Sequence, residues 1–529
     1  MKNPFRRNPQ AMEREEPVTV VSLERGWGEF GISALAVTVI LALCWYFAGL
    51  LIHQTNRGLG EFPDPVTGET QFDQDQKHNI SQALLTRDEA AAEVPGVWSE
   101  RLRQVMPHRT DGVVAPLWPW VASRLAPEGL LYSPHRVQEK DPEFFLRGKW
   151  ANVSIVMVFL WGLGLVMARA FRPAAVVTVL LLGAFGALLP RAVYFQPEPL
   201  YFVFFFLAWV CAVRLLIQND LWLHVLFGVL SGLAYLAKTS VEPMLLSWFG
   251  ISAWRFARGL FRKDDFTEEW RWTCRNHIFG LIVFAVGWMA VVGPRYSYSQ
   301  ERFGEARFTY PGAWMWFDDF DKGQNWMVEH PGKAELEKIP PGERPSFSLY
   351  AKTHTPEQMI NRLVDGYWAK MSHFLAPKIV KTKKDGTFDG WRVLLDRRGI
   401  YLGAVAAVFL ATVVIMWSRR RAVNRIGMSL PCGAGAAGMF VVGTLLGYGL
   451  LYGWYDPIGR GDRFMLSLYL PLVFSLIWGA ENLLDLALMR HAAWWIPRVY
   501  QGALWILNGA VAWRLITILR NPVFDPRLL

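Results

Sequence analysis

Long uninterrupted apolar runs are the feature that most constrains what this chain can fold into. About eleven runs approach the roughly 20 residues that an α-helix needs to cross a bilayer. They lie at residues 31–52, 150–167, 174–189, 200–217, 221–237, 241–254, 278–292, 400–417, 433–453, 464–480 and 500–518. An outer-membrane β-barrel is excluded because it would show short alternating segments. The sequence therefore predicts an all-α polytopic membrane protein with two long polar regions that carry short helices.

The composition agrees with this class. Of the 529 residues, 52% are hydrophobic and 19% are charged, and the charges gather between the apolar runs. The net charge of +10 is expected for basic residues that face anionic lipid, so the bilayer is the predicted partner and nucleic acid is not. The four cysteines, Cys44, Cys211, Cys274 and Cys432, form neither a disulfide framework nor a CxxC metal motif.

The basic residues in the short loops predict which side of the membrane each loop faces, because loops rich in lysine and arginine stay in the cytoplasm. The loops assigned to the inside carry Arg169, Arg172, Arg255, Arg258, Arg262, Lys263, Arg271, Arg275, Arg419, Arg420, Arg421, Arg425, Arg490 and Arg498. This orientation makes the chain an integral protein of the cytoplasmic (inner) membrane, with a cytoplasmic tail at 1–30 that precedes an uncleaved anchor. The transmembrane core then occupies 31–293, including an outer loop at 53–147. An extracytoplasmic cap region follows at 294–398, and C-terminal transmembrane helices at 399–529.

The outer loop contains two segments with functional potential. Residues 71–83 read QFDQDQKHNISQA, and Asp73 and Asp75 open a short predicted helix. Either carboxylate is a candidate general base, and either could equally cap a helix that carries Ile80 and Ala83. Further on, residues 115–125 could form an amphipathic helix on the membrane surface, with its tryptophans at headgroup level.

Several ionisable residues are predicted at the outer membrane boundary. They are Arg191 and Glu198 in RAVYFQPEPLYF, Lys238 and Glu242 in LAYLAKTSVEPM, and Asp456, Arg460, Asp462 and Arg463 in WYDPIGRGDRFM; Arg109 joins them from the outer loop. Charges at this depth are costly and tend to face a cavity. Arginine and lysine suit a lipid-linked phosphate, and a carboxylate could accept a proton from an acceptor hydroxyl.

Each of these residues also has a structural interpretation. Glu198 would complement a helix dipole, Lys238 could snorkel at a helix end, and Arg460 and Arg463 could be interface anchors. All of these ionisable residues are predicted on the same side of the membrane, and this shared location favours the functional interpretation. The histidines show no ligand spacing, so no metal site is predicted, and a divalent cation is left open as the cofactor.

The order of these features resembles the C-type glycosyltransferase superfamily (GT-C fold), in particular bacterial protein O-mannosyltransferases and lipid A aminoarabinose transferase-like proteins. Residues 75–83 match the spacing of the family's acidic motif, with Asn79 where an aromatic residue is usual, so both aspartates stay candidates. PHRTDGVVAPLWPW, QPEPLYF, GLAYLAK and GDRFMLSLYLPLVF are similar to family segments in the same order. The oligosaccharyltransferase signature is not matched, because Trp494-Trp495 is followed by Ile-Pro.

The resemblance implies transfer of a sugar from a polyprenyl-phosphate donor to a hydroxyl of a lipid, glycan or protein acceptor on the outer face, usually with inversion. Asp75, or Asp73, would be the base, and such proton transfer contributes roughly 10²–10⁴-fold. Lys238, Arg460 and Arg463 would bind the carrier phosphate, and Glu198 would be a pocket carboxylate.

A transporter or flippase for a lipid-linked or anionic solute is the alternative, although no two related halves are visible. A non-catalytic assembly scaffold is a third possibility.

Overall fold

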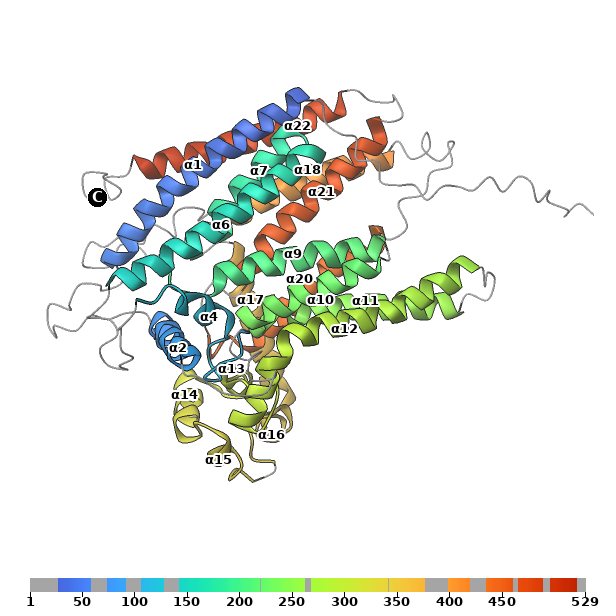
Figure 1. Ribbon diagram of the computed structural model, residues 1–529. Helices are drawn as coiled ribbons and strands as arrows, with labels where there is room; N and C mark the ends of the chain where they lie inside the picture. The colour runs from blue at the N-terminus through green and yellow to red at the C-terminus, as the bar shows by residue number, and fades with distance from the viewer. Residues whose placement is uncertain are drawn as a thin grey trace, which may run out of the picture.

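The computed structural model describes residues 27–58, 74–91, 106–127, 142–218, 220–261, 268–340, 342–375, 398–418, 434–459, 465–488 and 495–520. All regular structure within these ranges is helical. Figure 1 shows the long helices as a bundle, with α13, α14, α15 and α16 gathered at one end of it. Helices α2 (Gln74–Ala91) and α4 (Leu117–Ser123) lie between the bundle and this group (Figure 1).

The bundle is built from eleven long elements in the described part of the chain. They are α1 (Trp27–Gly58), α6 (Pro142–Ala170), α7 (Pro173–Gly183), α9 (Glu198–Ile217), α10 (Leu221–Ala237), α11 (Glu242–Phe261), α12 (Glu268–Phe303), α18 (Arg398–Ser418), α20 (Ala434–Trp454), α21 (Tyr469–Leu488) and α22 (Ile496–Leu519). In the described residues nine spans are long and apolar enough to cross a bilayer, and neither α10 nor α11 is among them. The all-α polytopic membrane architecture is confirmed, whereas a count of eleven transmembrane helices stays a prediction.

Helix α7 continues through a π-helical turn, η2 (Ala184–Leu188), into the short helix α8 (Leu189–Ala192). Pro190 lacks the N–H that an α-helix needs, and wide π-turns occur where the regular hydrogen-bond ladder is interrupted. Every residue of η2 is buried. The turn therefore sets the direction in which α8 presents Arg191.

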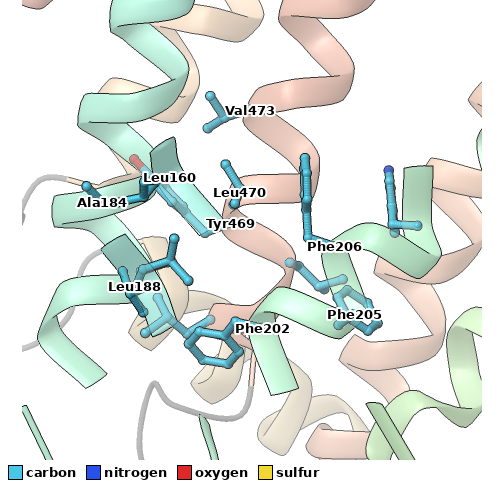
Figure 2. Close-up of a cluster of buried hydrophobic side chains, with 14 of the residues drawn as sticks. Leu160, Ala184, Leu188, Phe202, Phe205, Phe206, Tyr469, Leu470 and Val473 are labelled. Carbon is cyan, nitrogen blue, oxygen red and sulfur yellow. The ribbon is translucent and has the colours of Figure 1, made fainter. Parts of the chain in front are cut away.

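The centre of the bundle is the junction of α6, η2, α9 and α21. Figure 2 shows Leu160, Leu188, Phe202, Phe206 and Leu470 converging from these four elements. Phe206 and Phe474 meet edge to face with ring centroids 5.2 Å apart. Such interlocking matters here because lipid tails are as apolar as the core, so close packing must hold membrane helices together.

The sequence prediction was wrong in two places. Helix α12 does not end at Pro294 but continues to Phe303. Beyond the proline, the buried Arg295 guanidinium donates to the Tyr235 hydroxyl (3.1 Å) and lies over that ring, which ties the added turns to α10. Helix α4 forms within 115–125, but Trp118 is fully buried and contacts Phe195 instead of lying at headgroup level.

Helices α13 (Tyr310–Trp314), α14 (Phe320–Glu329), α15 (Lys333–Leu336), α16 (Phe347–Thr353) and α17 (Pro356–Leu375) form a small unit, which we call the cap (residues 304–375). Tyr310, Trp314 and Leu336 of the cap form an apolar cluster with Phe303, the last residue of α12, and with Ile458. Within the predicted region 294–398 these described helices begin only after α12 ends at Phe303, and the domain boundaries stay a prediction.

Glycines allow a close helix crossing in the bundle, between α10 and α12. A Cβ on Gly228 would lie 2.3 Å from the Phe284 carbonyl oxygen, and one on Gly232 would lie 3.1 Å from Val291. This Gly-x-x-x-Gly pair lets two backbones approach, as in other membrane helix pairs.

We predict opposite effects for two glycine substitutions. Gly228→Ala forces α10 away from α12 and should lower stability by roughly 1–3 kcal/mol, as overpacking does. Gly250→Ala, in α11 with nothing within 4 Å of the added methyl group, should raise stability through helix propensity by up to about 1 kcal/mol. Thermal unfolding of both purified variants in detergent measures the difference, and equal shifts in melting temperature would contradict the proposed contact.

A buried ion-pair cluster fastens the start of α7 to α21. The Arg172 guanidinium contacts Glu481 at 2.6 Å and Asp485 at 2.9 Å, and Arg172 and Glu481 are each only 2% exposed. Arg172 and Arg191 lie at opposite ends of the continuous α7–η2–α8 helix, so this cluster is far from the cap end.

Removing Arg172 should destabilise the protein strongly, because two carboxylates then lose their buried partner. Arg172→Leu should cost roughly 3–5 kcal/mol, whereas the triple change to Leu at 172, 481 and 485 should recover much of the loss. The matched control is Arg147→Leu, which breaks an exposed pair with Glu143 and should cost about 1 kcal/mol or less. Thermal unfolding ranks the three variants; a melting temperature for Arg172→Leu equal to the control would refute the prediction.

Candidate active site at the cap end of the bundle

The helix that begins with the acidic stretch is attached to the bundle by a buried side chain. Helix α2 starts at Gln74, so Asp75 lies in its first turn. Gln76 is fully buried, and its Oε1 accepts a hydrogen bond of 2.9 Å from the backbone N–H of Phe195. This bond joins segments that are 119 residues apart and brings the start of α2 to the connection between α8 and α9.

That connection, residues 193–197, is held from a second side. The Asn152 side-chain amide in α6 donates to the carbonyl oxygens of Tyr194 (2.8 Å) and Gln196 (2.9 Å). The Phe195 ring packs against Trp118, Phe144 and Phe145, with centroids 5.3, 5.5 and 6.1 Å away. A non-helical backbone in a buried position requires such partners, because its polar groups cannot reach water.

The two ends of this connection carry charged side chains. Arg191 is buried at the end of α8, and Glu198 is buried in the first turn of α9. The Lys238 Nζ lies 3.4 Å from Glu198 Oε1, with Lys238 at the end of α10. Glu198 and Lys238, both predicted at the outer boundary, thus form a direct, mostly buried ion pair.

A layer of tyrosines lies one turn further along α9. The Tyr201 and Tyr448 hydroxyls are 2.7 Å apart, and the Tyr448 hydroxyl donates to the Ser240 carbonyl oxygen. Ser240 follows Lys238 in the short 3₁₀ helix η3 (Thr239–Val241). The layer thus connects α9, α20 and the turn that carries Lys238, and it limits how far these groups can move.

Three other predicted residues are also among the described residues. Glu242 forms an exposed ion pair with Arg307, which precedes the cap helices. Arg109 is half-buried in the segment before α4, and Asp456 pairs with the buried Lys370 of α17 at 2.9 Å. Asp73, Arg460, Asp462 and Arg463 lie outside the described residues, as does the side chain of Asp75.

The first polar loop and the cap meet at the same end of the bundle. The Tyr310 N–H donates to the Gly112 carbonyl oxygen (2.8 Å), and His108 packs against Tyr298. Gly112 has φ +87°, and a Cβ there would come within 2.7 Å of the Tyr310 ring, so only glycine fits. The Asp111 carboxylate contacts His78 of α2 at 3.4 Å, which links α2 to the same turn.

Sequence reasoning missed two buried residues of this site, Lys149 and Asn152. Lys149 is fully buried in α6, with its ammonium 4.1 Å above the Phe145 ring. A lysine and an asparagine at the start of an apolar run are the signal that could have identified them, because polar groups inside a span are rarely without a role.

The arrangement suits an anionic ligand. Arg191 and Glu198 flank the connection, Lys238 pairs with Glu198, and Lys149 lies over the Phe145 ring, which stacks on Phe195. Buried guanidinium and ammonium groups bind phosphate through charge-assisted hydrogen bonds. The part of the chain that the structure describes contains no group of three or more His, Cys, Asp or Glu side chains placed to hold a metal ion.

Comparison with protein-family models, curated proteins and solved structures finds no significant match.

The Gln76 contact gives a local test of this geometry. Gln76→Leu should leave the Phe195 N–H without its acceptor and weaken the connection by about 1–3 kcal/mol. Hydrogen–deuterium exchange at residues 193–196 should then be faster than in the wild-type protein. The control, Ser81→Ala on the same helix, should leave that exchange unchanged, and protection retained in Gln76→Leu would refute the attachment.

Proposed function

We propose that the chain is a membrane glycosyltransferase that moves a sugar from a polyprenyl-phosphate donor to an acceptor hydroxyl on the extracytoplasmic face. The observation that carries this proposal is the Gln76–Phe195 hydrogen bond. It holds the first turn of α2, where Asp75 lies, beside the connection that carries Arg191 and Glu198. That the helix bearing Asp75 begins beside the buried connection flanked by Arg191 and Glu198 supports this proposal.

In this proposal each group has a distinct role. Asp75, or Asp73, accepts the proton of the acceptor hydroxyl as its oxygen attacks the anomeric carbon. The bond between that carbon and the phosphate oxygen breaks, and polyprenyl phosphate departs with the bonding electron pair. Arg191 and Lys238 stabilise the negative charge on this leaving group, and Glu198 holds Lys238 in position. Attack opposite the leaving group inverts the anomeric carbon.

The first test changes the carboxylates and reads the product directly. Membranes carrying wild type, Asp75→Asn, Asp73→Asn or Asp88→Asn are compared by mass spectrometry of their glycolipids and glycans. Loss of the base should reduce transfer roughly 10²–10⁴-fold, so a hexose- or pentose-sized addition disappears in one of the first two variants. Asp88→Asn is the matched control, because Asp88 lies in the last turn of α2 and pairs with Arg87 at the surface.

The outcomes separate the enzyme from a transporter. If the product persists in both Asp75→Asn and Asp73→Asn while each variant folds, the base assignment is refuted. If those variants keep normal glycan profiles and Lys238→Met abolishes movement of a polyprenyl-phosphate-linked sugar across vesicle membranes, the site serves transport instead.

A further inference from the structure

Helix α17 carries an exposed apolar face that the cap does not cover. Ile360, Val364, Trp368 and Leu375 are 60%, 46%, 67% and 39% exposed. At 100° per residue these side chains fall within a single sector of the helix. Large apolar residues that share one face mark a surface with a partner.

The remaining sectors of α17 are already occupied. Gly366, Lys370 and Phe374 are the buried residues of the helix and form its packing side. A Cβ on Gly366 would lie 2.0 Å from the Gly453 carbonyl oxygen, so α17 touches the backbone of α20. On the side away from the apolar sector, Gln358, Arg362 and Asp365 line a polar cavity of about 320 Å³.

The position of α17 on α20 identifies what covers the apolar sector. Gly449 and Gly453 of α20 contact Tyr367 of α17. The same face of α20 also carries Val442 and Leu446, whose side chains are 57% and 48% exposed. Helix α20 contains one of the candidate membrane spans, so this exposed face is the one that meets lipid. Helix α17 therefore lies on the lipid-facing side of α20, over its last two turns.

We propose that α17 is an interfacial helix whose apolar sector is inserted into the acyl chains of the membrane leaflet on the cap side. Amphipathic helices in this position bury their apolar face roughly 5–10 Å into the headgroup and acyl boundary. Trp368, near the middle of the sector, has the residue type that favours this depth. The polar sector then faces the cavity and water, and the cap is anchored to the bilayer as well as to the bundle. This inference depends on the membrane fold and not on glycosyl transfer.

Nitroxide accessibility in a bilayer tests the inference. In a background with all four cysteines replaced by alanine, single changes Val364→Cys and Trp368→Cys report on the apolar sector, and Gln358→Cys and Asp365→Cys on the polar sector. All four positions are on the exposed surface of α17, so substitution removes no core contact. Leu446→Cys on α20 is the lipid-facing reference. The labelled proteins are reconstituted in phosphatidylcholine–phosphatidylglycerol vesicles.

Labels at 364 and 368 should be several-fold more accessible to oxygen than to a water-soluble nickel chelate. The lipid-facing reference label at 446 should show the same preference. Labels at 358 and 365 should show the reverse ratio. Equal nickel accessibility in both sectors would place α17 in water and overturn the proposal. Protection of 364 and 368 from both reagents would also overturn it, because a protein surface such as a second copy of the chain would then cover the sector.

Discussion

The hydrogen bond from the Phe195 N–H to Gln76 is the contact on which the arrangement of the cap end depends. Residues 193–197 leave the helical path between α8 and α9 while remaining buried, so their backbone groups need partners from elsewhere in the protein. Gln76 supplies one and Asn152 supplies two. Because Arg191 and Glu198 flank this break, their positions follow from the two polar side chains that make the break tolerable.

The helical architecture could be predicted because the bilayer imposes a local rule that apolar runs record. The predicted run at 221–237 coincides with α10. Glu198 and Lys238, predicted at one boundary from their places next to apolar runs, form an ion pair. The extension of α12 and the burial of Trp118 depend on tertiary contacts instead. Arg295 binds Tyr235 and accompanies the extension of α12 past Pro294. Trp118 is enclosed by Phe195, a contact across the chain that no local pattern reveals.

The two ends of the α7–η2–α8 helix show how buried charges with different roles can be distinguished. Arg172 faces two carboxylates, so its charge is compensated within the protein and the cluster is structural. Arg191 instead flanks the non-helical connection that Gln76 and Asn152 hold, next to the Glu198–Lys238 ion pair. This irregular backbone, more than the burial itself, distinguishes the candidate site from the ion-pair cluster at the other end.

The attachments of the cap constrain how substrates could reach this site. The cap continues directly from α12, donates the Tyr310 N–H to Gly112, and touches the α20 backbone through Gly366. Rotation of the cap as a rigid lid would break the contacts with Gly112 and with α20 and, if α17 is inserted in lipid, withdraw its apolar sector from the acyl chains. In the proposed reaction the polyprenyl donor must therefore enter sideways from the bilayer, between helices. The acceptor hydroxyl would then arrive along the surface where α2, the segment before α4 and the cap meet.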